Sequence, residues 1–250
     1  MSPRWKRCSL LCAPSDFPIK GFIETSFIDW KSHLASVLFS AGCNFRCPFC
    51  HNADLVLRPD SLNDVPFDHI LGRLRKFRKW VKRVVLTGGE PTLHKGLART
   101  AEILKEQGAL VKLDTNGSRP DVVKALVRAG LVDYIAMDVK GPLGAYERWC
   151  GCHVDEGKIR ESIDFILEGR IDYEFRMTLV PFLHRERDAY QTALEIKPAR
   201  RFFVQEFVPR NALDERYEKV RPFSPEKMRN IRERVASILD NAPVRRRIHE

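Results

Sequence analysis

The sequence predicts an α/β fold in which parallel strands alternate with helices in a partial (β/α)6 barrel. Three observations support this fold class. Short apolar runs suited to buried strands alternate six times with longer segments of helical periodicity. Six such units in about 200 residues fit an open barrel better than a closed one with eight units. Motifs rich in Cys, Gly, Asp or Asn follow the first four strands, where folds of this class carry their chemistry.

Short apolar runs define the strands. The run at 34–41 consists of apolar and small residues, and the run at 84–86 is aliphatic and largely β-branched. A further segment at 22–30 predicts a short strand and turn packed on the edge of the barrel. The six barrel strands are predicted at 34–41, 84–86, 110–113, 134–137, 172–180 and 201–208.

Helical periodicity and helix-boundary residues define the helices. Phe67, Ile70 and Leu74 recur at the spacing of one helix face. Gly108 and Gly130 end two of the predicted helices, and Ser224 and Pro225 open the last one in N-cap and N1 order. The helices are predicted at 66–80, 95–107, 120–129, 156–168, 186–196 and 224–240.

The composition suits a protein with one substantial core. The chain has 250 residues, of which 44% are hydrophobic, and it lacks an apolar run of the about 18 residues that would span a membrane. Seven cysteines, three of them on one loop, favour reduced thiols and a cytoplasmic location over a disulfide framework. We therefore predict an irregular N-terminal extension at 1–21 and a single domain at 22–250, with no secretory signal.

The chain is basic, and part of the excess charge is local. It has 43 Lys and Arg against 33 Asp and Glu, a net charge of +10. Between Asp68 and Glu90 lie basic residues and no acidic ones. Such a patch is usually a solvated face, and it can also attract an acidic protein such as a small electron carrier. Nucleic acid is the poorer match, because the patch lacks aromatic residues spaced for base stacking. The basic residues are Arg73, Arg75, Lys76, Arg78, Lys79, Lys82 and Arg83.

Cys43, Cys47 and Cys50 lie just past the carboxyl end of the first barrel strand. Thiolates on one loop can bind one metal centre, but a structural zinc ion needs four protein ligands. A four-iron cluster also takes four, so three cysteines leave one iron open to a small molecule. His51 is adjacent to Cys50, and neighbouring side chains rarely reach the same ion. The spacing alone favours the cluster and leaves a zinc knuckle or three unrelated thiols open.

The Cys-x3-Cys-x2-Cys motif, with Phe49 before its last cysteine, resembles the signature of the radical S-adenosylmethionine (SAM) enzymes. Its surroundings at 42–52 are similar to the activating enzymes of glycyl-radical proteins, especially the anaerobic ribonucleotide reductase activator type. The resemblance extends over about residues 20–215. It implies that Cys43, Cys47 and Cys50 hold three irons of a [4Fe–4S] cluster and that SAM chelates the fourth.

The resemblance also implies SAM contacts at the ends of successive strands. Gly88, Gly89 and Glu90 match the segment that lies along the methionine end of SAM and holds its amino group. Pyruvate formate-lyase activating enzymes have a histidine where this chain has Asn211, and this difference favours the reductase-activator branch. The predicted SAM contacts are Phe49, Gly88, Gly89, Glu90, Asp114, Asp138, Lys140, Arg176, Val180 and Asn211.

Asp114 and Asp138 follow neighbouring strands, so their carboxylates need a proton, a lysine or a cation to neutralise them if they face one cleft. The alternative is that they cap helices. Both segments resemble those of pyruvate formate-lyase activating enzymes, in which such residues bind a monovalent cation. The resemblance implies that the cation ligands here are Asp114, Thr115, Asp138 and the backbone carbonyl of Ala136.

Four further cysteines lie outside the motif. Cys8 and Cys12 have no matching ligands nearby. Cys150 and Cys152 could be auxiliary-cluster ligands or a redox pair, but two cysteines are fewer than an auxiliary cluster usually needs. We interpret all four as incidental thiols and expect a single cluster.

The chemistry implied by the resemblance is reductive cleavage of SAM to methionine and a 5′-deoxyadenosyl radical, which removes a hydrogen from a backbone glycine of a partner enzyme. An oxidoreductase of this kind needs no side chain as general acid or base. The expected partners are a glycyl-radical enzyme, most simply an anaerobic ribonucleotide reductase, and a flavodoxin or ferredoxin as electron donor. One alternative is a radical SAM enzyme acting on a small molecule or RNA, similar to 7-carboxy-7-deazaguanine synthase. The other is a zinc-binding module.

Overall fold

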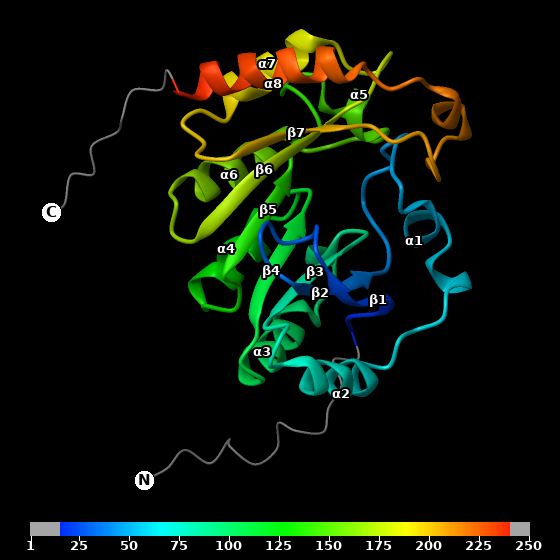
Figure 1. The fold of residues 1–250 in the computed structure, drawn as a ribbon, viewed down its shortest axis with the longest axis vertical. Coiled ribbons are helices and arrows are strands. Elements are labelled where there is room, and N and C mark those ends of the chain that lie inside the picture. Colours follow the sequence, from blue (N-terminus) through cyan, green and yellow to red (C-terminus); the bar gives the residue numbers. More distant parts are fainter. Residues whose placement is uncertain (1–15, 241–250) are drawn as a thin grey trace, which may run out of the picture.

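In the computed structural model, which describes residues 16–240, seven strands form one curved sheet with helices around its outside (Figure 1). Each strand pairs with its neighbours in sequence, in the order β1-β2-β3-β4-β5-β6-β7. The strands are β1 (Ile19–Ser26), β2 (Ala35–Ser40), β3 (Arg83–Gly88), β4 (Leu110–Thr115), β5 (Tyr134–Asp138), β6 (Asp172–Leu179) and β7 (Phe202–Glu206).

The pairing pattern confirms the predicted fold class. Strands β2 to β7 are parallel to one another, and the helices between them carry the chain back across the sheet. Strand β1 adds to β2 in the antiparallel direction, as Ile19 pairs with Ser40 and Ser26 with Ala35. Because β1 and β7 are the two ends of the strand order, the sheet forms a partial barrel with six parallel strands.

All six predicted helices are present, with ends within three residues of the prediction. Ser224 caps α8, since its hydroxyl oxygen accepts a hydrogen bond from the Lys227 amide at 3.2 Å. Two five-residue helices, α1 and α5, are too short to show periodicity and were not predicted. Within 16–240, no helix has the length and apolar character to cross a membrane. The helices are α1 (Ala53–Leu57), α2 (Phe67–Phe77), α3 (Leu97–Glu106), α4 (Pro120–Arg128), α5 (Tyr146–Cys150), α6 (Glu156–Leu167), α7 (Glu186–Glu195) and α8 (Pro225–Asp240).

The N-terminal part of the chain differs from the prediction at its boundary. Strand β1 begins at Ile19, so 19–21 belong to the sheet and not to an irregular extension. The rest of the predicted extension falls mainly on 1–15, which lie outside the described residues together with Cys8 and Cys12. The division into an extension and one domain therefore stays a prediction.

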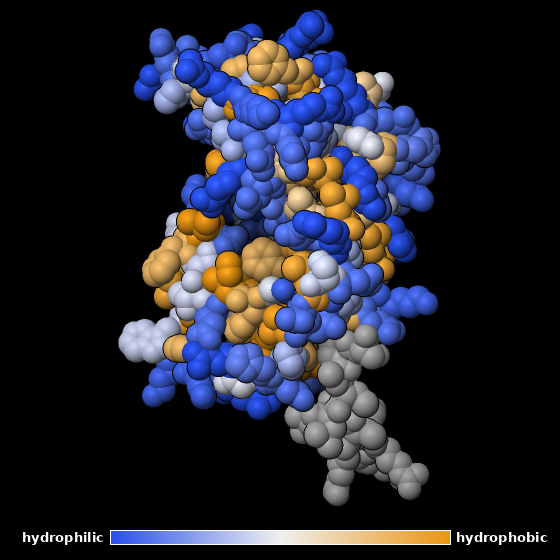
Figure 2. Space-filling view, turned by 90° about the vertical axis from the view of Figure 1, so that its right-hand side faces the viewer, coloured by the Kyte–Doolittle hydropathy of each residue, from blue (hydrophilic) through white to orange (hydrophobic). Residues whose placement is uncertain are grey.

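The main apolar core lies between the sheet and its helices. Leu38, Leu86, Leu113, Ile135 and Phe175 come from five successive strands, and each is at most 1% exposed. A smaller cluster beneath α7 and α8 packs on β6 and β7. Figure 2 shows one face of the molecule, on which hydrophobic residues gather across the middle and hydrophilic residues dominate elsewhere. One face of each barrel strand is therefore buried against the helices.

The opposite face of β4, β5 and β6 is charged. Side chains alternate along a strand, so Lys112 and Asp114 on β4, Asp138 on β5, and Glu174 and Arg176 on β6 point away from the apolar core. They form ion pairs with one another across the strands. The inner face of these three strands is thus largely polar and its charges are paired, whereas Val37 of β2 and Val85 of β3 belong to a separate apolar cluster.

Candidate functional site

The three motif cysteines line one pocket at the carboxyl end of the sheet. They lie on the loop that follows β2, and this loop turns at Gly42, whose φ is +68°. The Gly42 amide donates to the Leu55 carbonyl at 2.8 Å, which ties the loop to α1. Cys43, Cys47 and Cys50 all line the pocket, as the sequence predicts for ligands of one centre.

Side chains from the end of β4 hold the cysteine loop in place. Asn44 donates to the Ser118 hydroxyl at 2.9 Å, and Asn116 donates to the Asn44 side-chain oxygen at 2.9 Å. Arg46 folds over its own loop and donates to the carbonyls of Cys43 and Phe45 at 2.6 and 2.8 Å. The loop is therefore fixed by polar contacts to β4 and by contacts within itself.

The thiols have the chemistry of ligands for a cationic group. Burial raises the pKa of Cys43 to about 12 and also raises the pKa of Cys50. The pKa of Cys47 is lowered, because its interaction with the Cys150 thiol outweighs the effect of burial. Two buried thiols that resist ionisation in the protein alone become thiolates when they bind a positive metal centre. This donor set fits an iron–sulfur cluster.

A single metal ion fits the same residues less well. Among residues 16–240, no group of three or more His, Cys, Asp or Glu side chains is placed to hold one ion. His51 donates from Nε2 to the Val208 carbonyl at 2.8 Å, and its ring stacks on Phe207. The imidazole is thus engaged with the end of β7, which weakens the zinc alternative.

The backbone at Gly88 and Gly89 packs directly against the backbone at the end of β2 and the start of the cysteine loop. A Cβ on Gly88 would lie 2.4 Å from the Ser40 amide nitrogen, and one on Gly89 would lie 1.7 Å from the Gly42 carbonyl oxygen. The Gly89 amide donates to Ser40 O at 3.0 Å, and the Glu90 amide donates to Gly42 O at 2.8 Å. Both glycines line the cysteine pocket. The absence of side chains therefore serves the packing of the cysteine loop, besides opening the pocket to a ligand.

Glu90 is 1% exposed and links the segment after β3 to the end of β4 by hydrogen bonds. Its carboxylate accepts from the Thr92 amide at 3.2 Å, which caps a short 3-10 helix at Pro91–Leu93. It also accepts from the Thr115 hydroxyl at 2.7 Å and from the Asn116 amide at 2.6 Å. Burial raises the pKa of Glu90, although these hydrogen bonds oppose the shift. The sequence predicted a SAM contact here and gave no sign of this internal role.

Asp114 and Asp138 are joined by Arg176, whose side chain reaches both. Its Nη1 donates to Asp114 Oδ2 at 3.0 Å, and its Nε donates to Asp138 Oδ1 at 2.8 Å. Lys140 Nζ lies 3.3 Å from Asp138 Oδ2, and Lys112 Nζ lies 3.3 Å from Asp114 Oδ1. Burial alone would raise the pKa of Asp138, but Arg176 and Lys140 outweigh it and hold the pKa at about 2.

The neutralising charge required at these carboxylates therefore comes from side chains of the protein. Thr115, a predicted cation ligand, donates a hydrogen bond from its hydroxyl to Glu90. The cation site at Asp114, Thr115, Ala136 and Asp138 stays an untested prediction. Asp114 Oδ1 is buried and accepts no hydrogen bond from any described residue, and its one charged neighbour is Lys112 Nζ at 3.3 Å.

Seven of the ten predicted SAM contacts line the cysteine pocket, and three do not. Arg176 lies between the two aspartates, and the buried Val180 donates its amide to His184 Nδ1 at 3.1 Å. Asn211, whose φ is +54°, lines a second cavity that it shares with His51 and Asn52. The seven that line the pocket are Phe49, Gly88, Gly89, Glu90, Asp114, Asp138 and Lys140.

Several lining residues were not predicted. Asn52, Thr87, Asn116 and Thr178 contribute polar side chains, and Val56 contributes an apolar one. Thr178 could have been predicted from the sequence, because it lies two residues after Arg176 on β6 and its side chain is therefore on the same face of the strand. The other residues lie on loops or strand ends, where residue spacing does not indicate the direction of a side chain.

Behind the cysteine loop, His184 connects three segments. Its ring stacks on Trp149, with centroids 4.6 Å apart, and meets the ring of Phe49 edge-on at 6.0 Å. Its Nε2 donates to the Lys140 carbonyl at 2.8 Å, while Nδ1 accepts from Val180. Burial lowers the pKa of His184 to about 4, so the ring is neutral at physiological pH.

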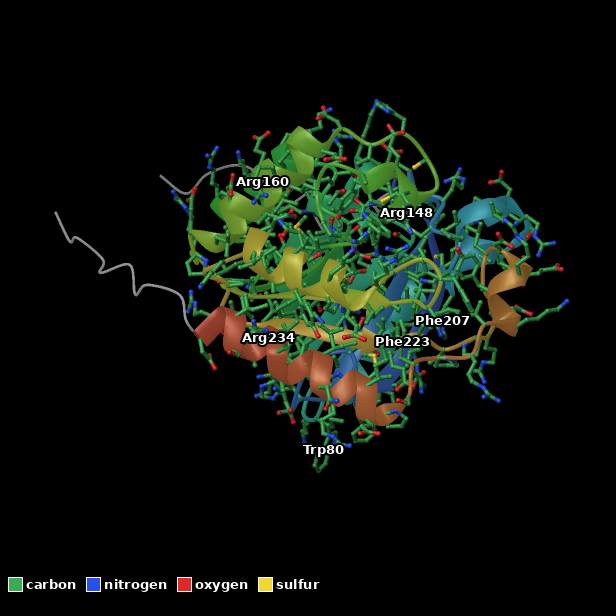
Figure 3. All side chains as sticks on the ribbon, turned by 90° about the horizontal axis from the view of Figure 1, so that it is seen from above. Trp80, Arg148, Arg160, Phe207, Phe223 and Arg234 are labelled. Carbon is green, nitrogen blue, oxygen red and sulfur yellow. The ribbon has the colours of Figure 1, made fainter. Side chains whose placement is uncertain are left out.

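The basic patch of residues 73–83 lies at the other end of the sheet. It covers the end of α2 and the start of β3, whereas the cysteine loop follows the carboxyl end of the parallel neighbour β2. Trp80 is 76% exposed, points away from the body of the molecule and lies far from Arg148 of α5 (Figure 3). This placement argues against the patch as the docking site of an electron carrier that must approach the cysteines.

Comparisons with known proteins indicate the family of this chain. Residues 37–192 match the model of the Radical SAM superfamily. A Methanocaldococcus jannaschii protein named "Putative glycyl-radical enzyme activating enzyme" is 30% identical over 239 residues, which cover 91% of this chain and 95% of that protein. The 7-carboxy-7-deazaguanine synthase of Neisseria meningitidis is 31% identical over 132 residues, which cover 52% of this chain and 56% of that protein.

Among solved structures, coproporphyrinogen III oxidase of Escherichia coli, described as a radical SAM enzyme, resembles the chain with a TM-score of 0.55 at 20% identity. The match covers 80% of this chain and 50% of that one. At this identity the likeness concerns the fold, and it agrees with the partial barrel described above.

Proposed function

This chain belongs to the radical SAM superfamily, and from that premise we propose that it activates a glycyl-radical enzyme. Membership implies a [4Fe–4S] cluster and SAM. The proposal of activation is supported by the relative named for this activity, because the similarity extends over nearly the whole length of both chains.

The observation that carries the proposal is the set of three thiols around one pocket. Cys43, Cys47 and Cys50 line it, and the histidine that lines it beside them, His51, is engaged with Val208. We propose that the three cysteines hold the cluster. When bound, the cluster supplies the electron for reductive cleavage of SAM, which starts the removal of a hydrogen atom from a glycine of the partner.

The residues around the cysteines would position SAM and keep the site dry. Gly88 and Gly89 expose backbone along one wall of the pocket, and Glu90 rigidifies that wall through its contact with Thr115. Asp114 lines the same pocket and is held by Lys112 and Arg176. Lys140, held beside Asp138, offers a positive charge to a carboxylate.

We propose an anaerobic ribonucleotide reductase as the partner and a flavodoxin or ferredoxin as the electron donor. A protein substrate needs an accessible surface at the pocket edge of the barrel. Phe182 follows the carboxyl end of β6 and is 88% exposed, and Val208 follows the end of β7 and is 53% exposed. These apolar side chains lie on the same edge of the sheet as the cysteine loop and suit contact with a partner protein.

The test is a reconstitution without oxygen. Purified protein is loaded with iron and sulfide, reduced, and incubated with SAM and the anaerobic ribonucleotide reductase of the same genome. We expect methionine and 5′-deoxyadenosine as products and a glycyl-radical doublet in the electron paramagnetic resonance spectrum of the partner. SAM cleavage without a doublet on any glycyl-radical enzyme of that genome would refute activation, while leaving the superfamily chemistry intact.

A second candidate function is supported by the similarity to 7-carboxy-7-deazaguanine synthase. That similarity covers about half of either chain, against almost the whole length for the activating relative. The same reduced protein, incubated with SAM and the substrate of that synthase, separates the two candidates. Formation of 7-carboxy-7-deazaguanine without a glycyl radical would favour the synthase.

A further inference from the structure

The turn after β4 contacts the cysteine loop through one buried asparagine. Asn116 is 5% exposed and lines the pocket that the three cysteines share. Its Nδ2 donates to Asn44 Oδ1, Asn44 Nδ2 donates to the Ser118 hydroxyl, and the Ser118 amide donates back to Asn116 Oδ1, each at 2.9 Å. The three residues thus form a closed hydrogen-bond network. Because Asn44 directly follows Cys43, this network joins the turn to the first cysteine of the motif.

The network fixes the direction of the Asn116 amide group. Its oxygen accepts from the Ser118 amide, so its nitrogen, which carries two N–H donors, faces the cysteine loop. One acceptor of this nitrogen is Asn44 Oδ1 at 2.9 Å, and the other is the sulfur of Cys43 at 3.9 Å. The asparagine that fastens the loop therefore also presents a donor to a cysteine sulfur.

The backbone around Asn116 is held by three further hydrogen bonds. The Asn116 amide donates to Glu90 Oε2 at 2.6 Å, and the Gly117 amide donates to the Thr115 hydroxyl at 3.1 Å. On the other side of the turn, the Ser162 hydroxyl of α6 donates to the Gly117 carbonyl at 2.6 Å. The side chain of Asn116 therefore projects from a turn that is fixed by two distant parts of the chain.

Cys43 has hydrogen-bond donors from two sources. The Phe45 amide, which belongs to the cysteine loop itself, lies 3.3 Å from the sulfur. Asn116 is 73 residues away in sequence and belongs to the end of β4. A donor within the loop moves with the loop, whereas a donor on a fixed turn holds the sulfur in place relative to the sheet. Donors on both sides suit a sulfur that carries negative charge as a metal ligand.

We propose that Asn116 is a positioning residue for the cluster, which fixes the Cys43 end of the ligand loop and donates an N–H···S hydrogen bond to the Cys43 sulfur. The inference rests on the cluster that superfamily membership implies and on the proposed role of the three cysteines as its ligands. It does not depend on which substrate the enzyme activates.

The physical consequence concerns the reduction of the cluster. A hydrogen bond to a ligand sulfur withdraws negative charge from it, and reduction adds negative charge to the cluster. The contact with Asn116 therefore favours the reduced state. Because Asn116 is buried, its amide dipole acts in an environment where electrostatic interactions are stronger than in water.

The experiment compares four proteins reconstituted without oxygen: the wild type, Asn116→Ala, Asn116→Ser and Ser118→Ala. The serine of Asn116→Ser can still accept from the Ser118 amide, but its short hydroxyl does not reach Asn44 or Cys43. Ser118→Ala breaks the network at Asn44 and leaves the Asn116 donor and the amide of residue 118 in place. Iron and sulfide content establishes that each protein holds a cluster, and circular dichroism establishes that each is folded.

The readout is the midpoint potential of the cluster, followed by redox titration with electron paramagnetic resonance in the absence of SAM. We expect Asn116→Ala and Asn116→Ser to lower it. Because the contact with sulfur is long, the ratio of reduced to oxidised cluster at a fixed potential should fall only about threefold. This change corresponds to about 28 mV for a one-electron couple, in which tenfold is about 59 mV. Ser118→Ala should stay at the wild-type potential.

Two outcomes would overturn the proposal. A wild-type potential in Asn116→Ala would mean that the amide does not influence the cluster. A shift in Ser118→Ala as large as that in Asn116→Ala would assign the effect to the packing of the loop rather than to a donor. If Asn116→Ala holds no cluster, Asn116→Ser decides, since a wild-type potential in the serine variant contradicts the donor role. The measurement needs neither SAM cleavage nor a partner enzyme, so its result stands even if the proposed activation of a glycyl-radical enzyme fails.

Discussion

Arg176 donates a hydrogen bond from Nε to Oδ1 of Asp138 at 2.8 Å across two neighbouring strands. The same guanidinium reaches Asp114 on the third strand, so one cation joins the carboxylates of β4 and β5. The planar guanidinium of arginine presents a rigid fork of donors, and here two of its nitrogens bind different carboxylates. The relationship explains how side chains of the protein balance the charge of these two buried acids.

Replacing Arg176 should therefore destabilise the fold. In Arg176→Met, Asp114 and Asp138 keep their lysine neighbours but lose the cation between them. Removing one partner of a buried ion network leaves uncompensated charge, so we expect the free energy of unfolding to fall by about 3 kcal/mol. Urea unfolding of the protein without cofactors, followed by circular dichroism, measures this change.

The matched control is Arg119→Met. Arg119 also pairs with an aspartate, Asp121, but both side chains are largely exposed. Exposed pairs contribute at most about 1 kcal/mol, so this variant should unfold close to the wild type. Equal decreases in the free energy of unfolding of the two variants would contradict the role assigned to Arg176.

The sequence allowed the fold to be predicted because its signals are local. Each barrel strand is an apolar run, and helix ends are marked by residues such as Ser224 and Gly108, so the order of elements follows from periodicity and boundary residues. The cysteine loop was also predicted, since three ligands within eight residues must lie close together. Helices α1 and α5 were missed because five residues are too few to show a period.

Contacts between distant residues could not be predicted in the same way. Spacing placed Asp114 and Asp138 on one edge, but it could not show that Arg176 lies between them and bonds both. The internal role of Glu90 depends on the Asn116 amide, 26 residues away, and the junction of Cys150 with Arg46 spans 104 residues. Such contacts depend on the register of the sheet and the paths of loops, which one sequence does not specify.

Gly89 is a position where a single methyl group should disrupt the site. A Cβ there would lie 1.7 Å from the Gly42 carbonyl oxygen, and backbone cannot rotate away as a flexible side chain can. In Gly89→Ala we expect the cysteine loop to shift, the free energy of unfolding to fall by more than about 2 kcal/mol, and iron uptake to decrease. Urea unfolding and iron analysis measure the two effects.

Gly72→Ala is the corresponding control. Gly72 lies within α2, and a Cβ there would meet no atom within 4 Å. Alanine is the better helix former, so this variant should gain about 0.5–1 kcal/mol and take up iron like the wild type. A destabilised Gly72→Ala variant, or a Gly89→Ala variant as stable as the wild type, would show that close backbone contact does not determine the effect of alanine at these positions.

His184 should make stability depend on pH in the weakly acidic range. The imidazole of an unfolded chain has a pKa of about 6.5, whereas burial lowers the pKa of His184 to about 4 in the folded protein. Between these values the unfolded chain binds a proton that the folded protein does not bind, so protons favour unfolding. The contribution of His184 to the free energy of unfolding, about 3 kcal/mol in total, is fully present above pH 6.5 and is lost as the pH falls toward 4.

His184→Gln tests this dependence. The free energies of unfolding of both proteins are measured by urea from pH 8 to pH 4. At pH 8 their difference gives the cost of the substitution itself, since the histidine is neutral in both states. The wild type should then lose more stability than the variant on acidification. Parallel curves would mean that His184 is protonated equally in the folded and unfolded chains.

The last prediction separates a cluster from a zinc site. Cys43→Ala, Cys47→Ala and Cys50→Ala each remove one of only three thiol ligands, so each variant should bind less than about a tenth of the wild-type iron after anaerobic reconstitution and lose the brown colour. His51→Ala removes a side chain whose Nε2 donates to Val208 and should retain most of the iron. A zinc site with three cysteines and one histidine requires all four residues. Metal analysis that finds zinc in the wild type, and its loss in His51→Ala as complete as in the cysteine variants, would refute the cluster and with it the proposed radical chemistry.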